Sequence, residues 1–246
     1  MLWEDEGVVL ALRRHGESAA VVSLLTAAHG RHAGLVRGGA GRRARPVYQI
    51  GNRLCVTWRA RLPEQLGSFT GELQEAIAAA LLDRPDRLAA LGSACALLEA
   101  SLPERDPHAL LYNELNELIH VLQKQDDWPE RYVRFELALL AELGFGLDLT
   151  ACAVTGEQAD LAYVSPRSGR AVGRAAAGAY APRLLPLPPF LLGVGAADPA
   201  QIEAGLRLTG SFLQRHLLDP VERPMPGARE RLLRQLAGPA VPPAAL

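Results

Sequence analysis

Guanidinium groups are concentrated in one stretch of this chain. Between residues 13 and 61 there are ten arginines and a single acidic residue, Glu17. Positive charge gathered on one module attracts phosphates, so this stretch indicates a polyanionic ligand. We therefore expect phosphate contacts with DNA from the following residues: Arg13, Arg14, Arg31, Arg37, Arg42, Arg43, Arg45, Arg53, Arg59 and Arg61.

Charge is distributed unevenly along the sequence. Residues 1–70 contain ten basic and five acidic side chains, a net charge of +5, whereas residues 71–150 contain six basic and fifteen acidic ones, a net charge of −9. Residues 151–246 contain ten basic and seven acidic ones, a net charge of +3. The chain has 25 arginines and one lysine, Lys124, so composition bias explains the choice of arginine. It does not explain the segregation, which indicates a positive module beside an acidic body.

The other reactive residue types form no catalytic or metal-binding pattern. The glycines of Gly38–Gly41 are not a P-loop, because no Gly-Lys-Ser/Thr follows, and we expect a flexible basic linker there. His29 and His32 lack a third ligand nearby in the sequence, which favours roles in a turn and in phosphate contacts. Cys152 has threonine, not a second cysteine, three residues later. With no Gly-x-Ser-x-Gly elbow either, the sequence predicts no enzyme site, metal or cofactor.

Bulk features predict a soluble cytoplasmic protein. The three cysteines, Cys55, Cys95 and Cys152, are far apart and odd in number, which argues against a disulfide framework. The acidic first residues do not have the basic and apolar regions of a signal peptide. The apolar stretch Leu184–Val194 is short and interrupted by prolines, so it cannot span a membrane.

Residues 7–72 predict short strands separated by turns. Apolar runs at 8–12, 20–25 and 34–36 are joined by turn signals around Gly16 and Gly30. In residues 53–62, Leu54, Val56 and Trp58 alternate with polar residues, so three arginines fall on the opposite face. A fifth strand is expected at 66–72. Five short strands suit a small closed barrel, and the OB-fold is the five-stranded barrel that binds oligonucleotides.

Aromatic residues are sparse in this β region. Trp58 falls on the apolar face and is expected in the core, whereas Tyr48 and Phe69 are candidate platforms for base stacking. Nucleic-acid binding is therefore expected to be mainly electrostatic and weakly sequence-selective.

The rest of the chain predicts helices around an irregular segment. Leucines recur every three or four residues between 88 and 140, and Asp106 and Asp127 are candidate helix caps. Residues 148–195 are rich in glycine and proline, with a candidate strand at 161–165. A capping-box pattern at Asp198 opens a helix that ends at Asp219, and a last helix spans about 227–236. The expected fold is α+β and multidomain: an OB-fold barrel at 1–74, a helical domain at 75–147 and 196–237, an insertion at 148–195, and a disordered tail at 238–246.

Several stretches, taken in their order and spacing, resemble the RecO family of bacterial recombination mediators. Together they span about residues 4–175. The last two of them resemble the central helix of the family and the entry to its zinc-ribbon segment. The stretches are Gly7–Ser18, Ser23–Thr26, His29–Arg31, Gly34–Gly39, Arg134–Gly144 and Leu147–Cys152.

The resemblance implies an OB-fold domain followed by a helical domain with a zinc-ribbon-like insertion. It implies non-enzymatic binding of single- and double-stranded DNA, strand annealing, and help in loading RecA recombinase onto strands coated by single-stranded-DNA-binding protein, in DNA repair and recombination. The implied partners are RecR, RecF and the acidic carboxy-terminal tail of the single-stranded-DNA-binding protein, with RecA contacted indirectly, at the nucleoid. We expect the tail to dock in an apolar groove of the helical domain near Arg131 or Arg134.

One departure from the family pattern bears on zinc. Zinc-bearing members have two CxxC pairs, whereas this chain has Cys152 followed by Thr155, and Val172–Ala175 stands where the second pair would lie. Zinc is therefore not expected. The insertion should be held by packing, with Leu161, Tyr163 and Val164 as candidates.

Two other functions fit the same charge pattern. The first is an OB-fold factor that binds RNA, which competition between RNA and DNA would separate from the DNA reading. The second is an interaction scaffold whose basic face binds an acidic protein tail, which predicts no affinity for DNA at moderate salt. An enzyme is a third possibility without a site to name.

Overall fold

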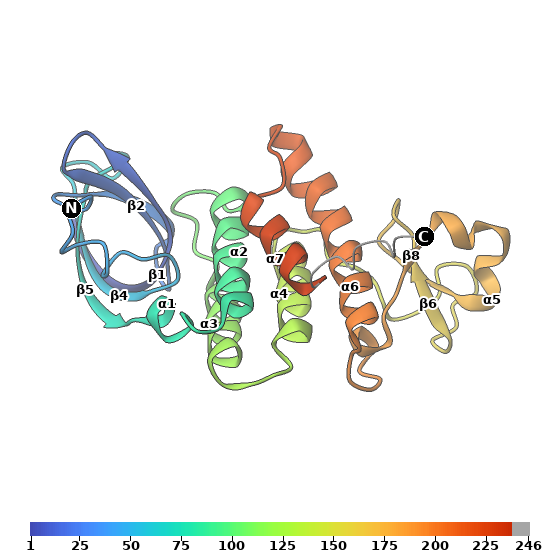
Figure 1. Cartoon of the computed structure of the whole chain (residues 1–246). Coiled ribbons are helices and arrows are strands. Elements are labelled where there is room, and N and C mark those ends of the chain that lie inside the picture. Colours follow the sequence, from blue (N-terminus) through green and yellow to red (C-terminus); the bar gives the residue numbers. More distant parts are fainter. Residues whose placement is uncertain (238–246) are drawn as a thin grey trace, which may run out of the picture. The chain divides into compact units, whose positions relative to one another are not determined.

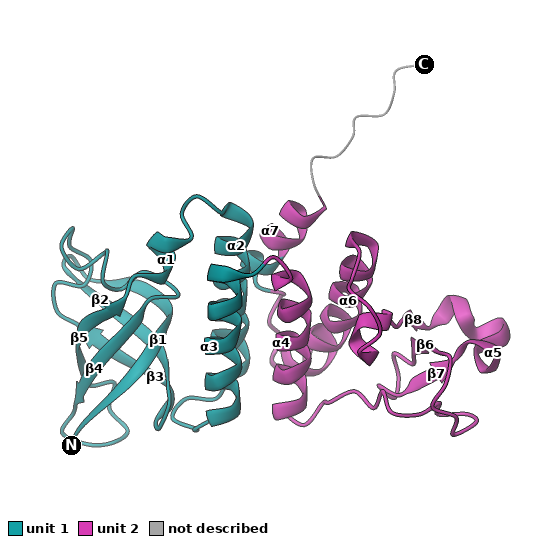
Figure 2. Ribbon diagram, turned by 90° about the horizontal axis from the view of Figure 1, so that it is seen from below, with its two compact units in different colours: residues 1–125, 226–229 teal, residues 126–225, 230–246 magenta. Residues whose placement is uncertain are grey.

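The computed structural model describes residues 1–237 and shows two compact units. Unit 1 comprises Met1–Gln125 with Pro226–Arg229, and unit 2 comprises Asp126–Met225 with the residues from Glu230 onward (Figure 2). The domain boundary expected after residue 74 does not separate these units, because the first helices cluster with the barrel in unit 1. The tail predicted to be disordered, residues 238–246, lies outside the described residues.

Unit 1 begins with the closed five-stranded barrel that the sequence predicts. The strands hydrogen-bond in the order β1-β2-β3-β5-β4, and β4 closes the barrel against β1. Neighbouring strands are antiparallel except β3 and β5, which run parallel. This is an OB-fold architecture. Figures 1 and 2 show its strands, with β3 labelled in Figure 2: β1 (Leu2–His15), β2 (Ala19–Thr26), β3 (Gly30–Val36), β4 (Arg53–Arg59) and β5 (Ser68–Glu75).

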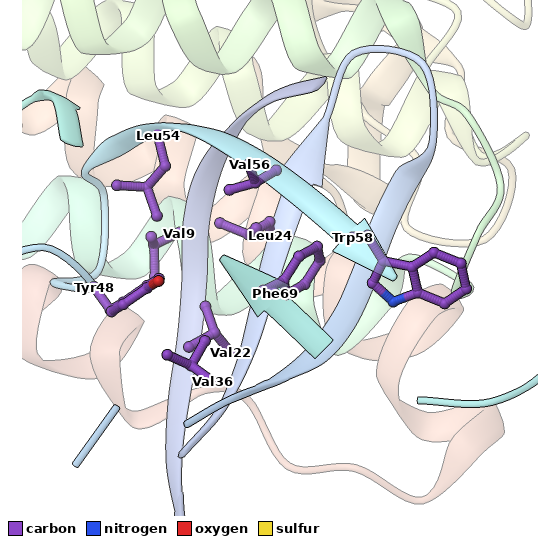
Figure 3. Close-up of a cluster of buried hydrophobic side chains, with 9 residues drawn as sticks. All are labelled: Val9, Val22, Leu24, Val36, Tyr48, Leu54, Val56, Trp58 and Phe69. Atoms are coloured by element: carbon purple, nitrogen blue, oxygen red, sulfur yellow. The ribbon is translucent and has the colours of Figure 1, made fainter. Parts of the chain in front are cut away.

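The barrel core is filled by the side chains that the alternation predicted. In β4, Leu54, Val56 and Trp58 are buried, whereas the residues between them are partly exposed. Figure 3 shows these side chains converging with those of neighbouring strands. Tyr48 and Phe69 belong to the same cluster, with only 6% and 3% of their surface exposed. The prediction that they are base-stacking platforms is therefore wrong, because neither ring is open to a ligand.

The first strand starts earlier than the sequence predicted. Residues Leu2–Glu6 are acidic and lack apolar alternation, yet they extend β1 by pairing with β4, with Leu2 opposite Arg59 and Glu6 opposite Cys55. A strand of this kind is stabilised by the backbone partners that its neighbour supplies. Local sequence does not report such a partner, which explains the missed residues.

Three helices complete the first unit. The leucine stripes of the sequence mark buried faces, since Leu91, Leu98, Leu115 and Leu122 are fully buried. The start of the third helix differs from the prediction, because it begins at Ala109 without a side-chain cap and Asp106 lies outside it. The helices are α1 (Ile77–Ala80), α2 (Pro85–Ser101) and α3 (Ala109–Lys124).

Unit 2 contains the remaining helices. Asp198 caps α6 as predicted, since its Oδ1 accepts a hydrogen bond from the N–H of Gln201 at 2.8 Å. Asp127 precedes α4 but makes no side-chain cap. The helix from 199 continues as a π-helical turn, Leu213–Leu218, and stops at Asp219, close to the predicted end. The α-helices are α4 (Trp128–Glu142), α5 (Arg174–Ala177), α6 (Pro199–Phe212) and α7 (Gly227–Leu236), the last beginning in unit 1.

The insertion is built on a small antiparallel sheet in the order β7-β6-β8. Leu161 and Val164 are buried in it, and Tyr163 is half-buried. Cys152 is buried beside the sheet, and its Sγ accepts the N–H of Gly173 at 3.2 Å. This hydrogen bond is the main cause that lowers the pKa of Cys152 to about 7. The strands are β6 (Leu161–Val164), β7 (Ala171–Gly173) and β8 (Leu185–Pro186).

Candidate nucleic-acid interface

Strand direction places the connections of the barrel at two ends. Strands β1, β3 and β5 run one way and β2 and β4 the other. The β1–β2 and β3–β4 connections therefore lie at one end, and the amino terminus lies at the other with the β2–β3 and β4–β5 connections. Figure 3 shows Tyr48 and Trp58 at opposite sides of the core cluster between them. The two ends differ in charge and in ring content.

Six of the ten predicted arginines gather at the first end, which we call the basic end. Arg14 pairs across to Ala20, and Ala20 pairs to Val36, so the residue after Val36 lies beside the β1–β2 hairpin. The backbone N–H of Ala40 donates to the carbonyl of Ser18 at 3.0 Å and joins the two connections. The six exposed residues of the basic end are Arg13, Arg14, Arg37, Arg42, Arg43 and Arg45.

The glycine-rich segment, predicted to be a flexible basic linker, is held in a series of turns by backbone hydrogen bonds. Consecutive backbone hydrogen bonds, including Gly41 N–H to Gly38 and Arg45 N–H to Gly41, turn it on itself. Its end is anchored by Tyr48, whose hydroxyl accepts the N–H of Gly71 at 3.0 Å. Burial raises the pKa of Tyr48, so the hydroxyl stays neutral. Arginines on such a segment are presented to solvent by a fixed backbone, which lowers the entropy lost when a phosphate binds.

Two predicted residues, Arg31 and Arg53, make hydrogen bonds and ion pairs within unit 1. The side chain of Arg31 is only 13% exposed, and its Nε donates to the carbonyl of Leu102 at 2.8 Å, with Glu99 and Glu104 as ion-pair partners. Arg53 donates to Asn116 Oδ1 at 2.8 Å and pairs with Glu75 at 3.5 Å. A phosphate would have to displace these partners, so we leave both arginines out of the interface.

Arg59 and Arg61 lie at the other end of the barrel, where they do not form a positive face. Arg59 is opposite Leu2, at the start of β1, whereas Arg13 and Arg14 are near its end. Directly opposed residues on neighbouring strands share a face. On the outer face of β4, Arg53 and Arg59 therefore lie among four carboxylates of the neighbouring strands: Glu4, Glu6, Glu72 and Glu75. The predicted second positive surface along β4 is not present.

The face of strands 2 and 3 that binds oligonucleotides in many OB-folds is covered here. Ser23 on β2 points away from the core, yet it is buried, and its hydroxyl donates to Glu99 of α2 at 2.6 Å. The β4–β5 connection is also occupied, because the guanidinium of Arg105 donates to the carbonyls of Pro63 and Gln65. The connections of the basic end remain as the exposed basic surface of the barrel.

Stacked rings close the second end, which we call the aromatic end. The imidazole of His29 lies flat on Trp3, with ring centroids 3.9 Å apart and planes 7° apart, and its Nδ1 is 3.0 Å from a carboxylate oxygen of Asp5. His32 is buried edge-on against Trp3 and Trp58. Burial, with Arg105 and His29 nearby, lowers the pKa of His32 to about 4. The histidines thus pack in the barrel, and the spacing of Trp3 from His29 gave no sign of the stack.

The predicted docking residues for a protein tail lie in unit 2. Arg134 is committed to the chain, since its guanidinium donates to the carbonyl of Phe190 and lies 5.8 Å from the centre of that ring. Arg131 is partly buried on α4. An apolar groove of about 540 Å³ does exist in this unit, between the start of α4, α6 and α7. Neither arginine lines it, and the charged residue in its wall is Glu203.

Comparisons with known proteins agree with this architecture. The family model described as "Recombination protein O N terminal" matches residues 1–76, and "Recombination protein O C terminal" matches residues 82–224. The chain belongs to the RecO family. It is 52% identical over 238 residues to the DNA repair protein RecO of Cereibacter sphaeroides strain KD131, covering 96% of this chain and 99% of the relative. It is 52% identical over 242 residues to the DNA repair protein RecO of Rhodospirillum rubrum, covering 95% and 96%.

Two structural findings complete the description of this RecO-family chain. Within residues 1–237, no helix is long and apolar enough to cross a membrane. Across the same residues, no three His, Cys, Asp or Glu side chains come together in a way that could hold a metal ion. Cys152 is therefore not part of a metal-binding group of this kind, and its Sγ accepts the N–H of Gly173.

Proposed function

We propose that this RecO-family protein is a non-enzymatic recombination mediator that binds single- and double-stranded DNA through the basic end of its barrel. The observation that supports this most directly is the gathering of six exposed arginines on two connected segments, with Glu17 as the acid among them. Among residues 13–20 and 37–50, the exposed aromatic ring is the imidazole of His15, whereas Tyr48 is buried. A surface of this type binds phosphates and is indifferent to base identity.

The proposed activity is annealing of complementary strands. Two polyanions repel each other, and a basic surface lowers this repulsion by displacing their condensed counterions. The reaction needs no nucleotide hydrolysis, in keeping with the lack of a P-loop sequence. If three to six phosphates are neutralised, the slope of log affinity against log salt for single strands is roughly −2 to −4.

The proposed partners are RecR, RecF and the acidic tail of the single-stranded-DNA-binding protein, with RecA loading as the outcome. The support is membership of the family, since the residues predicted for tail docking do not line the apolar groove. An acidic tail is disfavoured at a groove whose wall carries Glu203. We therefore expect the tail to bind outside this groove, which titration of a labelled tail peptide against an Arg131→Glu variant tests.

Annealing of labelled complementary oligonucleotides, bare and coated with the cognate single-stranded-DNA-binding protein, tests the function across a salt series. The proposal predicts acceleration that persists on coated strands and weakens as salt rises. A variant with Arg42, Arg43 and Arg45 replaced by Glu should not accelerate annealing of either bare or coated strands. Binding that never anneals would contradict the mediator function and leave a general nucleic-acid binder. Stronger competition by RNA than by DNA would favour the RNA-binding alternative.

A further inference from the structure

Unit 2 carries a second surface that combines rings with arginines. Phe145 is 39% exposed, and its ring stacks on His216 with centroids 4.9 Å apart and planes 23° apart. His216 also stacks on Phe212, at 5.8 Å and 11°, and Phe212 is buried in the core. The exposed ring is thus the outer member of a stack that rests on the interior of the unit. We call this surface, with the arginines described next, the Phe145 patch.

The backbone fixes the exposed ring in place. Gly144 ends α4 in a conformation with φ of 89°, and the N–H of Phe145 donates back to the carbonyl of Leu140 at 2.8 Å. This is the reversal that commonly ends a helix, in which the residue after the glycine normally packs its side chain on the last turn. Here the ring stacks on His216, which lies in the π-helical turn that follows α6. Turns of this kind often occur at functional sites.

Three exposed arginines lie on segments that are joined to the stack by sequence or by hydrogen bonds. Arg215 precedes His216, and its Nη1 donates to the carbonyl of Pro166 at 2.8 Å, which places the exposed Arg167 nearby. Arg170 pairs with Asp148 at 3.4 Å, and the N–H of Asp148 donates to the carbonyl of Gly169. Hydrogen bonds thus join the segment that carries Phe145 to the segment that carries Arg167 and Arg170. The patch has three exposed arginines and one acid, Asp148, and the surface pair of Asp148 with Arg170 contributes only about 0–1 kcal/mol, so a phosphate can displace it.

We propose that the Phe145 patch binds an unpaired segment of DNA, with a base stacked on Phe145 and the neighbouring phosphates held by Arg167, Arg170 and Arg215. This rests on the proposed function, because it adds a second DNA contact to the basic end. Unpaired bases stack on aromatic rings whatever their identity, while arginines follow the backbone. A duplex keeps its bases inside, so the patch selects single strands, which the basic end does not do. During annealing, the basic end then binds the phosphates of single- or double-stranded DNA, and the Phe145 patch binds unpaired bases.

The test measures whether binding depends on bases. The full-length protein is titrated with a fluorescent thymidylate oligonucleotide, with an oligonucleotide of equal length in which several bases are replaced by abasic sites, and with a duplex. The expected result for Phe145→Ala is a loss of affinity for the thymidylate strand of about five- to a hundredfold. Affinity for the abasic strand and for the duplex stays within about twofold of wild type. Phe145→Tyr, which keeps a ring, restores binding of the thymidylate strand.

Controls separate this inference from the proposed function. The Arg42, Arg43 and Arg45 to Glu variant should lose abasic-strand and duplex binding while retaining a difference between thymidylate and abasic strands. If that variant binds all three probes as wild type does, the proposed DNA binding by the basic end is contradicted. The Phe145 patch is then tested by the Phe145→Ala variant alone. Equal loss of all probes in Phe145→Ala, with a lowered melting temperature, would show a structural role and overturn the proposal.

Photocrosslinking locates the contact directly. A strand containing 5-iododeoxyuridine should form an adduct in the peptide that includes Phe145, and the adduct should disappear in Phe145→Ala. Adducts confined to residues 37–48 would overturn the proposal. Replacing Arg167 and Arg215 by Gln gives a second check. If this variant loses binding of an acidic peptide but keeps binding of the oligonucleotide, the patch binds a protein partner and the proposal is overturned.

Discussion

The two ends of the barrel are closed by rings in similar ways, but they present opposite surfaces. At the basic end Tyr48 fills the opening, and the segment that carries it displays arginines. At the aromatic end Trp3 and His29 fill the opening, with the carboxylate of Asp5 on the imidazole. Closing a barrel therefore does not determine what its end binds. The difference arises from the charged side chains that the connections at each end carry, because the basic end displays six exposed arginines on two connections.

The largest effect should come from charge reversal at the basic end. Replacing Arg42, Arg43 and Arg45 by Glu should weaken binding of single-stranded DNA roughly 100-fold at moderate salt, because three attractive phosphate contacts become repulsive. Replacing Arg59 and Arg61 by Glu, a reversal of two arginines at the other end of the barrel, should change affinity less than about threefold. Fluorescence anisotropy measures both.

The same pair of variants tests the comparison of the two ends. The salt slope should fall by about 2 in the basic-end variant and stay unchanged in the other. Equal loss of affinity in both variants would show that DNA contacts the two ends alike. Far-ultraviolet circular dichroism checks that both variants keep the barrel.

A smaller effect, on stability and not on binding, is expected at the aromatic end. Trp3→Ala removes a half-buried ring that contacts His29, His32 and Trp58, and should lower the free energy of unfolding by about 2 kcal/mol. Urea unfolding gives this value. DNA affinity below the unfolding transition should remain that of wild type. A loss of affinity in Trp3→Ala would mean that the stacked rings take part in binding.

The sequence predicted the barrel, its core strand β4 and most helices, because these depend on local periodicity. Strand β4 alternates in burial as its sequence does, and α7 has the predicted bounds. The acidic half of β1 was missed because its partner, β4, lies about fifty residues away. A strand that depends on a distant partner need not show alternation in its own sequence.

For the candidate site, the sequence identified the arginines of the barrel but could not show which of them the chain leaves exposed. Arg31 and Arg43 look alike in the sequence, yet Arg31 is bound to Glu99 and Glu104 of a later segment and Arg43 is exposed. The acids that neutralise an arginine can lie anywhere in the chain, so only the fold separates the two cases. The Phe145 stack was missed for a similar reason, because its rings are about seventy residues apart.

Acid should destabilise the aromatic end through His32. Its pKa is lowered from 6.5 to about 4, mainly by burial. Between these two pH values the imidazole is protonated in the unfolded chain but neutral in the folded chain. Stability therefore falls as pH drops through this window. His32→Leu should reduce the loss between pH 7 and pH 5 by about 1–2 kcal/mol. Urea unfolding at both pH values measures the difference, and an equal loss in the two proteins would contradict the assignment.

The smallest predicted effect lies within the basic end itself. Arg13 pairs with Glu99 at 3.4 Å although its side chain is 75% exposed, whereas Arg43 is exposed on the glycine-rich segment. A surface pair of this kind contributes about 0–1 kcal/mol, and DNA must offset it before Arg13 can bind a phosphate. Arg13→Ala should therefore weaken DNA binding by about twofold and Arg43→Ala by about fivefold.

Glu99→Gln, made in the wild type and in the Arg13→Ala variant, separates the ion pair from the phosphate contact. If Glu99 restrains Arg13, the substitution raises affinity in the wild type and has no effect in Arg13→Ala. An equal rise in both backgrounds would show that Glu99 acts through its charge or through its other partner Arg31, and that its pair with Arg13 does not limit binding.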